Sequence, residues 1–254
     1  MTITSSTGAP GAVDAKEPAD WRGFWRVLLA LVAPIPGVAL AISNFVTPGD
    51  LAGSATETLA AVADNQGAAQ AAQVFSLVFL VFLVPSGVAM LMAMRRVAPR
   101  AATIVAGFVT LGFCAGVTNP RTLDVALIAA QQDLNPVAAT TIMSQLDLLP
   151  TTVIAIIPFA LTITLGRIAL GVVLWRTRIA PRWMAVAMLL AGPVEWGLGA
   201  AIGNHGPALA YLLTAVGFAS ASWALLHMSN GEFDLPPLAE DRSHVVVTNP
   251  RGVA

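Results

Sequence analysis

Six long apolar runs constrain the fold of this chain more than any other feature of its sequence. A helix of ~20 apolar residues spans the ~30 Å hydrocarbon core of a bilayer. One such run can also be a buried helix of a soluble protein, but six in one chain favour a membrane. Charged residues make up 11% of the chain, against about 25% in a typical soluble domain. The sequence therefore predicts an all-α polytopic membrane protein, a bundle of six transmembrane helices at about residues 27–46, 75–94, 101–119, 152–174, 183–203 and 207–228.

Arginine and lysine are distributed very unequally between the two predicted sides of the bundle. If the hydrophilic segments alternate sides, one side holds both termini and eleven basic residues, and the other holds Arg121 alone. The eleven are Lys16, Arg22, Arg26, Arg95, Arg96, Arg100, Arg176, Arg178, Arg182, Arg242 and Arg251. Loops rich in arginine and lysine face the cytoplasm. We therefore predict a multi-pass protein of the cell's inner (plasma) membrane with both termini cytoplasmic.

The two ends of the chain differ in composition from the region between them. Residues 1–20 are rich in Ser, Thr, Gly, Ala and Pro, and residues 229–254 are polar and contain Pro236-Pro237 and Asn249-Pro250. Segments that cannot bury apolar surface stay disordered. The sequence thus predicts two disordered cytoplasmic tails around a transmembrane domain at residues 21–228.

Local signals predict further features of the spans and loops. Pro34 and Pro36 interrupt the first span, so we expect a kink at which neighbouring helices satisfy the freed carbonyls. The Ala-rich stretch from Ser54 to Gln73 could form a helix outside the bilayer. The pair Asn135-Pro136 fits a helix N-cap followed by proline at the first helical position, which predicts a short helix before Leu149.

The turn between the predicted fourth and fifth spans carries the motif Arg-x-Arg-x-Ala-Pro-Arg-Trp, residues 176–183. With the apolar span that follows, this motif resembles bacterial polytopic inner-membrane proteins of a family of unknown function. The resemblance covers about 30 residues. It implies a multi-span inner-membrane protein and carries no activity with it.

One arginine and one glutamate lie inside the predicted spans. Arg167 falls in the fourth span and Glu195 in the fifth. Side chains lean toward the N-terminus of their own helix, so an antiparallel hairpin aims the two groups at each other if both face the same seam. A lone charge at the centre of a membrane helix costs about 2.5–3.5 kcal/mol. We therefore predict an intramembrane ion pair or polar site at Arg167 and Glu195.

Other polar residues are sparse. Asn44, Asn204 and His205 lie at the predicted outer ends of spans and could line an outer vestibule. The single cysteine, Cys114, leaves no multi-cysteine metal site. The histidines are far apart in sequence, so we predict no metal site and no cofactor. No basic stripe with interleaved aromatic residues supports nucleic-acid binding.

Three functions stay open on the sequence. The first is a transport-type site for a small solute or protons, with Glu195 as the titrating group and Arg167 as its counter-ion. The second is an intramembrane enzyme on a lipid-soluble, prenyl-type substrate, with Glu195 as general acid; without a phosphate-binding motif it has less support. The third is a structural or accessory subunit whose flat helical faces bind partners, and in which the ion pair fixes helix packing. The expected partners are the lipid bilayer, a small-solute or lipid-soluble ligand, and a second membrane protein.

Overall fold

A computed structural model describes residues 20–50, 53–117 and 122–234, and these residues form helices and no strand. Six of the helical segments are long and apolar enough to cross a membrane. They are Arg22–Val46, Gln66–Met94, Pro99–Gly116, Pro150–Thr177, Arg182–Ile202 and His205–His227. The predicted all-α bundle of six transmembrane helices is therefore confirmed, and the chain is a multi-pass membrane protein.

The first span is broken into α1 (Arg22–Val32) and α2 (Ile35–Val46) at the expected prolines. Pro34 has no N–H to donate to the carbonyl of Ala30, and the hydroxyl of Ser222 donates to that carbonyl at 2.5 Å instead. The hydroxyl of Ser86 donates to the carbonyl of Ala33 at 2.6 Å. Two neighbouring helices thus satisfy the backbone groups at the break, as predicted.

The second span, α4 (Gln66–Met94), begins nine residues before the predicted start at 75. The side chain of Asn65 accepts the N–H of Ala68 at 3.1 Å and so begins this helix. The extension carries α4 out of the bundle toward a layer formed by α3 (Ala55–Asp64), α6 (Thr122–Gln131) and α7 (Pro136–Asp147). We call these three helices the cap.

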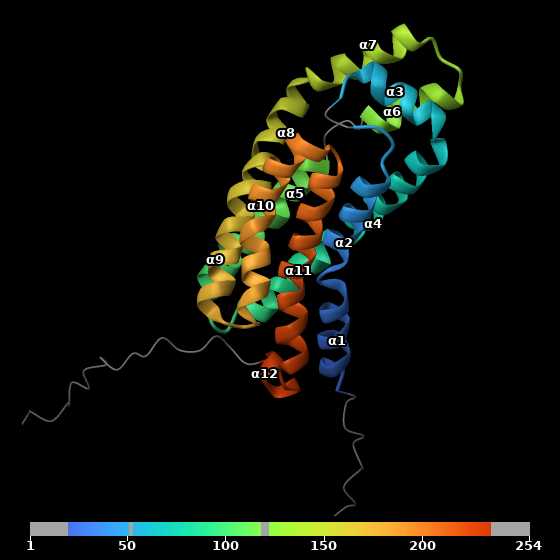
Figure 1. Cartoon of the computed structure of the whole chain (residues 1–254). Coiled ribbons are helices and arrows are strands. Elements are labelled where there is room, and N and C mark those ends of the chain that lie inside the picture. The colour runs from blue at the N-terminus through green and yellow to red at the C-terminus, as the bar shows by residue number, and fades with distance from the viewer. Residues whose placement is uncertain (1–19, 51–52, 118–121, 235–254) are drawn as a thin grey trace, which may run out of the picture.

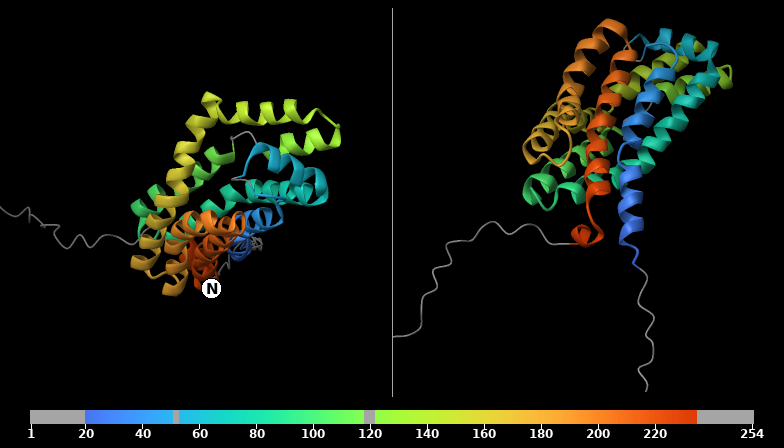
Figure 2. Two further views of the ribbon diagram at one scale, coloured as in Figure 1. Left: turned by 45° about the horizontal axis from the view of Figure 1, so that its top comes forward. Right: turned by 60° about the horizontal axis from the view of Figure 1, so that its bottom comes forward.

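The cap has its own small core, and it overhangs one side of the bundle (Figures 1 and 2). Leu59, Val62, Leu127 and Met143 are buried there together with small residues. Ser54 and Glu57 form a capping box at the start of α3. Asn135 accepts the N–H of Val137 at 2.9 Å, so the predicted N-cap of α7 is confirmed. The predicted third span ended at 119, and residues 118–121 lie outside the described part of the chain.

The remaining spans are α5 (Pro99–Val117), the segment α8 (Pro150–Leu161) to α9 (Arg167–Thr177), α10 (Arg182–Ile202) and α11 (His205–His227). A π-helical turn, η1 (Thr162–Gly166), joins α8 to α9. Helix α11 is the most buried of the six spans, and it packs against α1, α2, α4 and α10. The core of the bundle therefore lies around α11.

The start of α1, the α4–α5 turn, the α9–α10 turn and a short helix α12 (Asn230–Asp234) lie at one end of the molecule, opposite the cap (Figure 1). We call it the arginine end, because it carries most of the arginines. The last described residue thus lies at the same end as the first one, as an even number of spans requires. Helix α12 begins inside the segment predicted to be disordered from 229 on, because Phe233 is buried against the bundle. The other predicted tail residues, 1–19 and 235–254, lie outside the described residues.

Candidate functional site

Arg167 is positioned by the irregular turn that precedes it. Its backbone N–H bonds to the carbonyl of Thr162, five residues back, and to that of Thr164, three residues back, whereas an α-helix uses the carbonyl four residues back. The preceding helix carries Pro158, which has no N–H for the regular ladder. Because each residue of an α-helix advances by about 100°, the extra residue in this turn rotates Arg167 by about that angle relative to an uninterrupted helix.

The rotated Arg167 side chain meets Glu195 of α10. Nη1 of the arginine lies 2.5 Å from Oε2 of the glutamate, and the two side chains are 0% and 11% exposed. The two charges therefore form a buried salt bridge between α9 and α10. A pair of this kind offsets the cost of each charge only when the geometry is good and the remaining polar atoms are satisfied.

Two aromatic rings complete the contacts of the pair. The hydroxyl of Tyr211 in α11 donates to Oε1 of Glu195 at 3.1 Å. The Arg167 guanidinium carbon lies 4.7 Å from the centroid of the Tyr211 ring and 5.6 Å from that of Phe113 in α5. Both distances fall in the range of attraction between a cation and an aromatic face. Each carboxylate oxygen of Glu195 thus has a partner, and Arg167 is held by side chains from three helices.

The guanidinium itself is only partly satisfied. Arginine carries five N–H donors, yet Nε and Nη2 of Arg167 are buried and have no acceptor among the described residues. These two nitrogens form one edge of the planar group, and such an edge matches two oxygens of a carboxylate or phosphate. Buried polar groups without partners are rare and call for a water or a ligand. The site therefore presents two adjacent buried donors for which the described residues offer no acceptor.

Helix α10 docks closely on the π-helical turn next to the pair. A Cβ added to Gly192 would lie 3.2 Å from the carbonyl oxygen of Ile163, so a side chain here would require the backbone of the turn to move by a few tenths of an ångström. The indole Nε1 of Trp196 donates to the hydroxyl of Thr164 at 2.9 Å, although the Trp196 ring is mostly exposed. These contacts hold the segment that carries Glu195 against the segment that carries Arg167.

The three residues predicted to line an outer vestibule lie near the cap end of the bundle. The amide of Asn204 donates to the carbonyl of Gly49 at 2.7 Å, and the His205 ring packs edge-on against Phe45 at 5.4 Å. The amide of Asn44 donates to the carbonyl of Leu40 in its own helix. Asn204 and His205 therefore join the start of α11 to the end of α2, whereas a vestibule role of the three residues stays a prediction.

Sequence reasoning did not single out Tyr211 and Phe113. Tyr211 is the only tyrosine of the chain, and a buried tyrosine hydroxyl normally finds a partner, which is the signal that could have pointed to it. Nothing in the sequence distinguishes Phe113 from the other phenylalanines. Within the described residues, no group of three or more His, Cys, Asp or Glu side chains is placed to hold a metal ion.

Comparison with known proteins gives a family and no activity. A family model described as "Domain of unknown function (DUF4386)" matches residues 25–228, which is most of the chain. This agrees with the resemblance to a family of unknown function. No curated protein and no solved structure matches the chain.

Proposed function

Because the chain belongs to this family of unknown function, we propose its role from its own site: it binds a small oxyanion solute at Arg167, as a transport-type membrane protein. The observation that carries the proposal is the Nε–Nη2 edge of a completely buried guanidinium, for which the described residues offer no acceptor. A carboxylate or phosphate-like group would accept two parallel hydrogen bonds there. Glu195 is the counter-ion that holds the site neutral when the solute is absent.

The net charge of the site predicts that a proton binds together with the oxyanion. The pair Arg167 and Glu195 carries no net charge, so a singly charged oxyanion that enters would leave one excess negative charge in a buried place. Such a charge is costly inside a membrane. A proton taken up by Glu195 would cancel it, and the Tyr211 hydroxyl would then share Oε1 with a neutral carboxyl group. Oxyanion binding and proton uptake are therefore coupled in the proposed function.

The test measures thermal stabilisation of the purified full-length protein by four probes: acetate, lactate, phosphate and sulfate. A ligand that binds only the folded state stabilises it by about 2.7 kcal/mol at 100 times its Kd. We expect at least one probe to raise the melting temperature of the wild type. Arg167→Lys keeps the charge and lacks the two-nitrogen edge, so it should lose this stabilisation. Arg176→Lys, at an exposed position of the same helix, is the matched control and should keep it.

The proton is followed in proteoliposomes that contain a pH-sensitive dye. Addition of the stabilising anion outside should acidify the lumen faster than in protein-free vesicles with the wild type and with Arg176→Lys, and only at the protein-free rate with Arg167→Lys. The proposal is wrong if no probe shifts the wild type more than it shifts Arg167→Lys. It is also wrong in its coupled form if the anion enters without a proton.

The second candidate function is a packing device. The observation that favours it is the complete burial of the Arg167 side chain between α9, α10 and α11. In that case, an ordered water would fill the donor edge, and the anions would not distinguish Arg167→Lys from the wild type. The enzymatic alternative has no specific observation in its favour among the described residues.

A further inference from the structure

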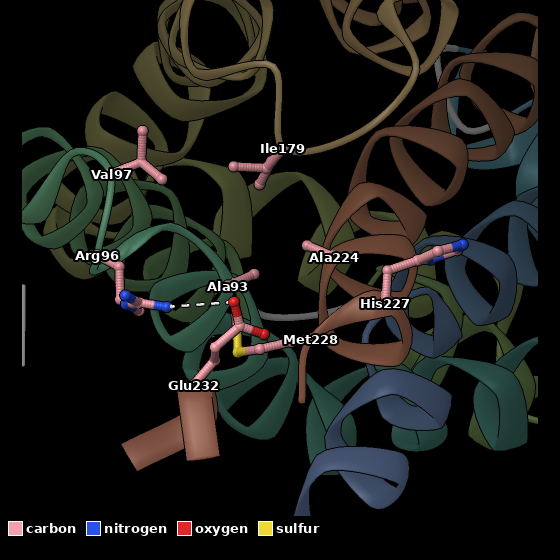
Figure 3. A pocket seen from close by; sticks show the side chains of 8 residues that line it. All are labelled: Ala93, Arg96, Val97, Ile179, Ala224, His227, Met228 and Glu232. Atoms are coloured by element: carbon pink, nitrogen blue, oxygen red, sulfur yellow. Dashed lines mark ion pairs between the residues drawn. The ribbon is translucent and has the colours of Figure 1, made fainter. Parts of the chain in front are cut away.

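A second polar site lies at the arginine end, far from the buried pair along the spans. A cavity of about 400 Å³ opens there between the end of α4, the α9–α10 turn, the end of α11 and α12 (Figure 3). Its walls include Arg96, Val97, Ile179, His227, Met228 and Glu232. One side of the cavity is thus charged and the rest is mainly apolar, which suits an amphipathic occupant.

Arg96 is loosely held in this cavity. Its Nη1 lies 3.9 Å from Oε1 of Glu232, which is too long for a hydrogen bond. Its Nε is buried and has no acceptor among the described residues. The other Glu232 oxygen, Oε2, accepts the N–H of Ser229 at 2.8 Å and so serves the start of α12. Glu232 is therefore a weak partner that a better acceptor can replace.

Helix α12 can stay in place when Arg96 changes its partner. A guanidinium nitrogen of Arg95 donates to the carbonyl of Phe233, and the Phe233 side chain is buried. Nη1 of Arg22 also lies 3.7 Å from Oδ2 of Asp234, at the end of α12. His227 takes no part in the polar side of the cavity, because its ring stacks on Trp223 at 4.3 Å and points away from Arg96 (Figure 3). Arg96 is thus the cation available to an incoming group.

The tryptophans near the cavity indicate which layer of the membrane its mouth faces. Five of the six tryptophans of the chain lie at the arginine end, and each is exposed: Trp21, Trp25, Trp175, Trp183 and Trp223. Exposed tryptophans favour the headgroup layer of a membrane. Clusters of arginines at this depth attract acidic lipids, and basic pockets between helices bind their headgroups. The cavity therefore opens where phospholipid phosphates are found.

We propose that this cavity binds an acidic phospholipid of the leaflet at the arginine end. Its phosphate replaces Glu232 as the partner of Arg96, and the first part of an acyl chain lies against Val97, Ile179 and Met228. The inference goes beyond the oxyanion site at Arg167, because it concerns other residues at another depth. The phosphate chemistry would also fit a free phosphate, and the experiment separates the two sources.

The experiment uses the full chain in phosphatidylcholine vesicles and measures the association of spin-labelled phosphatidylglycerol relative to spin-labelled phosphatidylcholine. We expect the wild type to prefer phosphatidylglycerol. Arg96→Gln should lower that preference about tenfold, because the phosphate of phosphatidylcholine already has its own choline cation, whereas that of phosphatidylglycerol depends on Arg96 for a charged hydrogen-bond donor. Arg100→Gln removes the same charge from an exposed position at the same end and should leave most of the preference. Glu232→Gln removes the competitor and should raise the preference.

Three results would overturn the proposal. If the wild type shows no preference, the cavity does not select an acidic lipid. If Arg96→Gln and Arg100→Gln lower the preference equally, it reflects only the overall positive charge of the arginine end. If inorganic phosphate or glycerol phosphate displaces the labelled lipid completely, the cavity is a site for free phosphate. The melting temperature of each variant in phosphatidylcholine alone shows that it is folded.

Discussion

Arg167 and Glu195 lie 28 residues apart in the chain, yet Nη1 of the arginine and Oε2 of the glutamate approach to 2.5 Å. The contact joins two antiparallel helices inside the span of the membrane. It depends on the extra residue in the π-helical turn η1 before Arg167. It also depends on Gly192 of α10, where the lack of a side chain lets η1 pack closely against α10.

The first prediction concerns the stability of this pair. Removal of one partner leaves an uncompensated buried charge, so Glu195→Gln and Arg167→Met should each lower the free energy of unfolding by about 3 kcal/mol. The double variant should recover most of the loss, because it removes both charges. Melting temperatures in detergent measure this cycle, and additive losses would contradict the contact. A packing pair and a binding site share this result, so the anion experiment decides between them.

The second prediction separates the two roles of Tyr211. Tyr211→Phe removes the 3.1 Å hydrogen bond to Glu195 and keeps the ring beside Arg167, so it should cost about 1 kcal/mol. Tyr211→Leu also removes the ring and should cost more, because it loses the contact with the cation. Melting temperatures again provide the readout. Equal losses in the two variants would show that the ring contributes nothing beyond its hydroxyl.

The third prediction tests the close packing of α5 on the π-helical turn. A Cβ at Gly112 would lie 1.6 Å from Oγ1 of Thr162 and 2.9 Å from the carbonyl oxygen of Pro158. Gly112→Ala should therefore destabilise the protein by about 1–3 kcal/mol, as overpacking does. Gly107→Ala on the same helix is the control, because its Cβ would meet nothing within 4 Å. That variant should be neutral or slightly stabilising, and a loss as large as that of Gly112→Ala would refute the interpretation.

The fourth prediction concerns the break in the first span. Ser222→Ala leaves the carbonyl of Ala30 without a donor, so it should cost about 1–3 kcal/mol. In a Pro34→Ala background, the new N–H can donate to that carbonyl, and the cost of Ser222→Ala should shrink. Ser220→Ala is the matched control, because its buried hydroxyl has no partner among the described residues. Additive effects of the Pro34 and Ser222 changes would argue against the compensation.

The fifth prediction is a pH dependence in the cap. The N–H and then the hydroxyl of Ser54 hold the pKa of Glu57 below its ordinary value. The stabilisation of α3 is therefore fully present above the ordinary carboxyl pKa of about 4.3 and is lost as the pH falls through the lowered value. Amide-exchange protection of α3, corrected for the intrinsic rate, should fall on acidification. In Glu57→Gln the protection should be lower near neutrality and should change less with pH.

The sequence by itself determined the membrane class, the six spans and the residues that mark them. Long apolar runs leave a helix as the only way to satisfy the backbone in lipid, and the prolines at 34 and 36 and the Asn135-Pro136 pair act through local geometry. These features need no knowledge of distant contacts. The same holds for the choice of Arg167 and Glu195, because a charge in an apolar span is visible without a structure.

Only the tertiary structure decided how the pair is oriented and what surrounds it. The rotation of α9 depends on one extra residue in η1, and no pattern in the sequence reports that residue. The partnership with Tyr211 and Phe113 joins α5, α10 and α11, which are far apart in the chain. Helix α12 forms in a polar segment because Phe233 finds a place against the bundle, and its local composition predicted disorder. Local sequence patterns depend on residues within about one helical turn of each other, whereas these contacts form only when separate helices pack together.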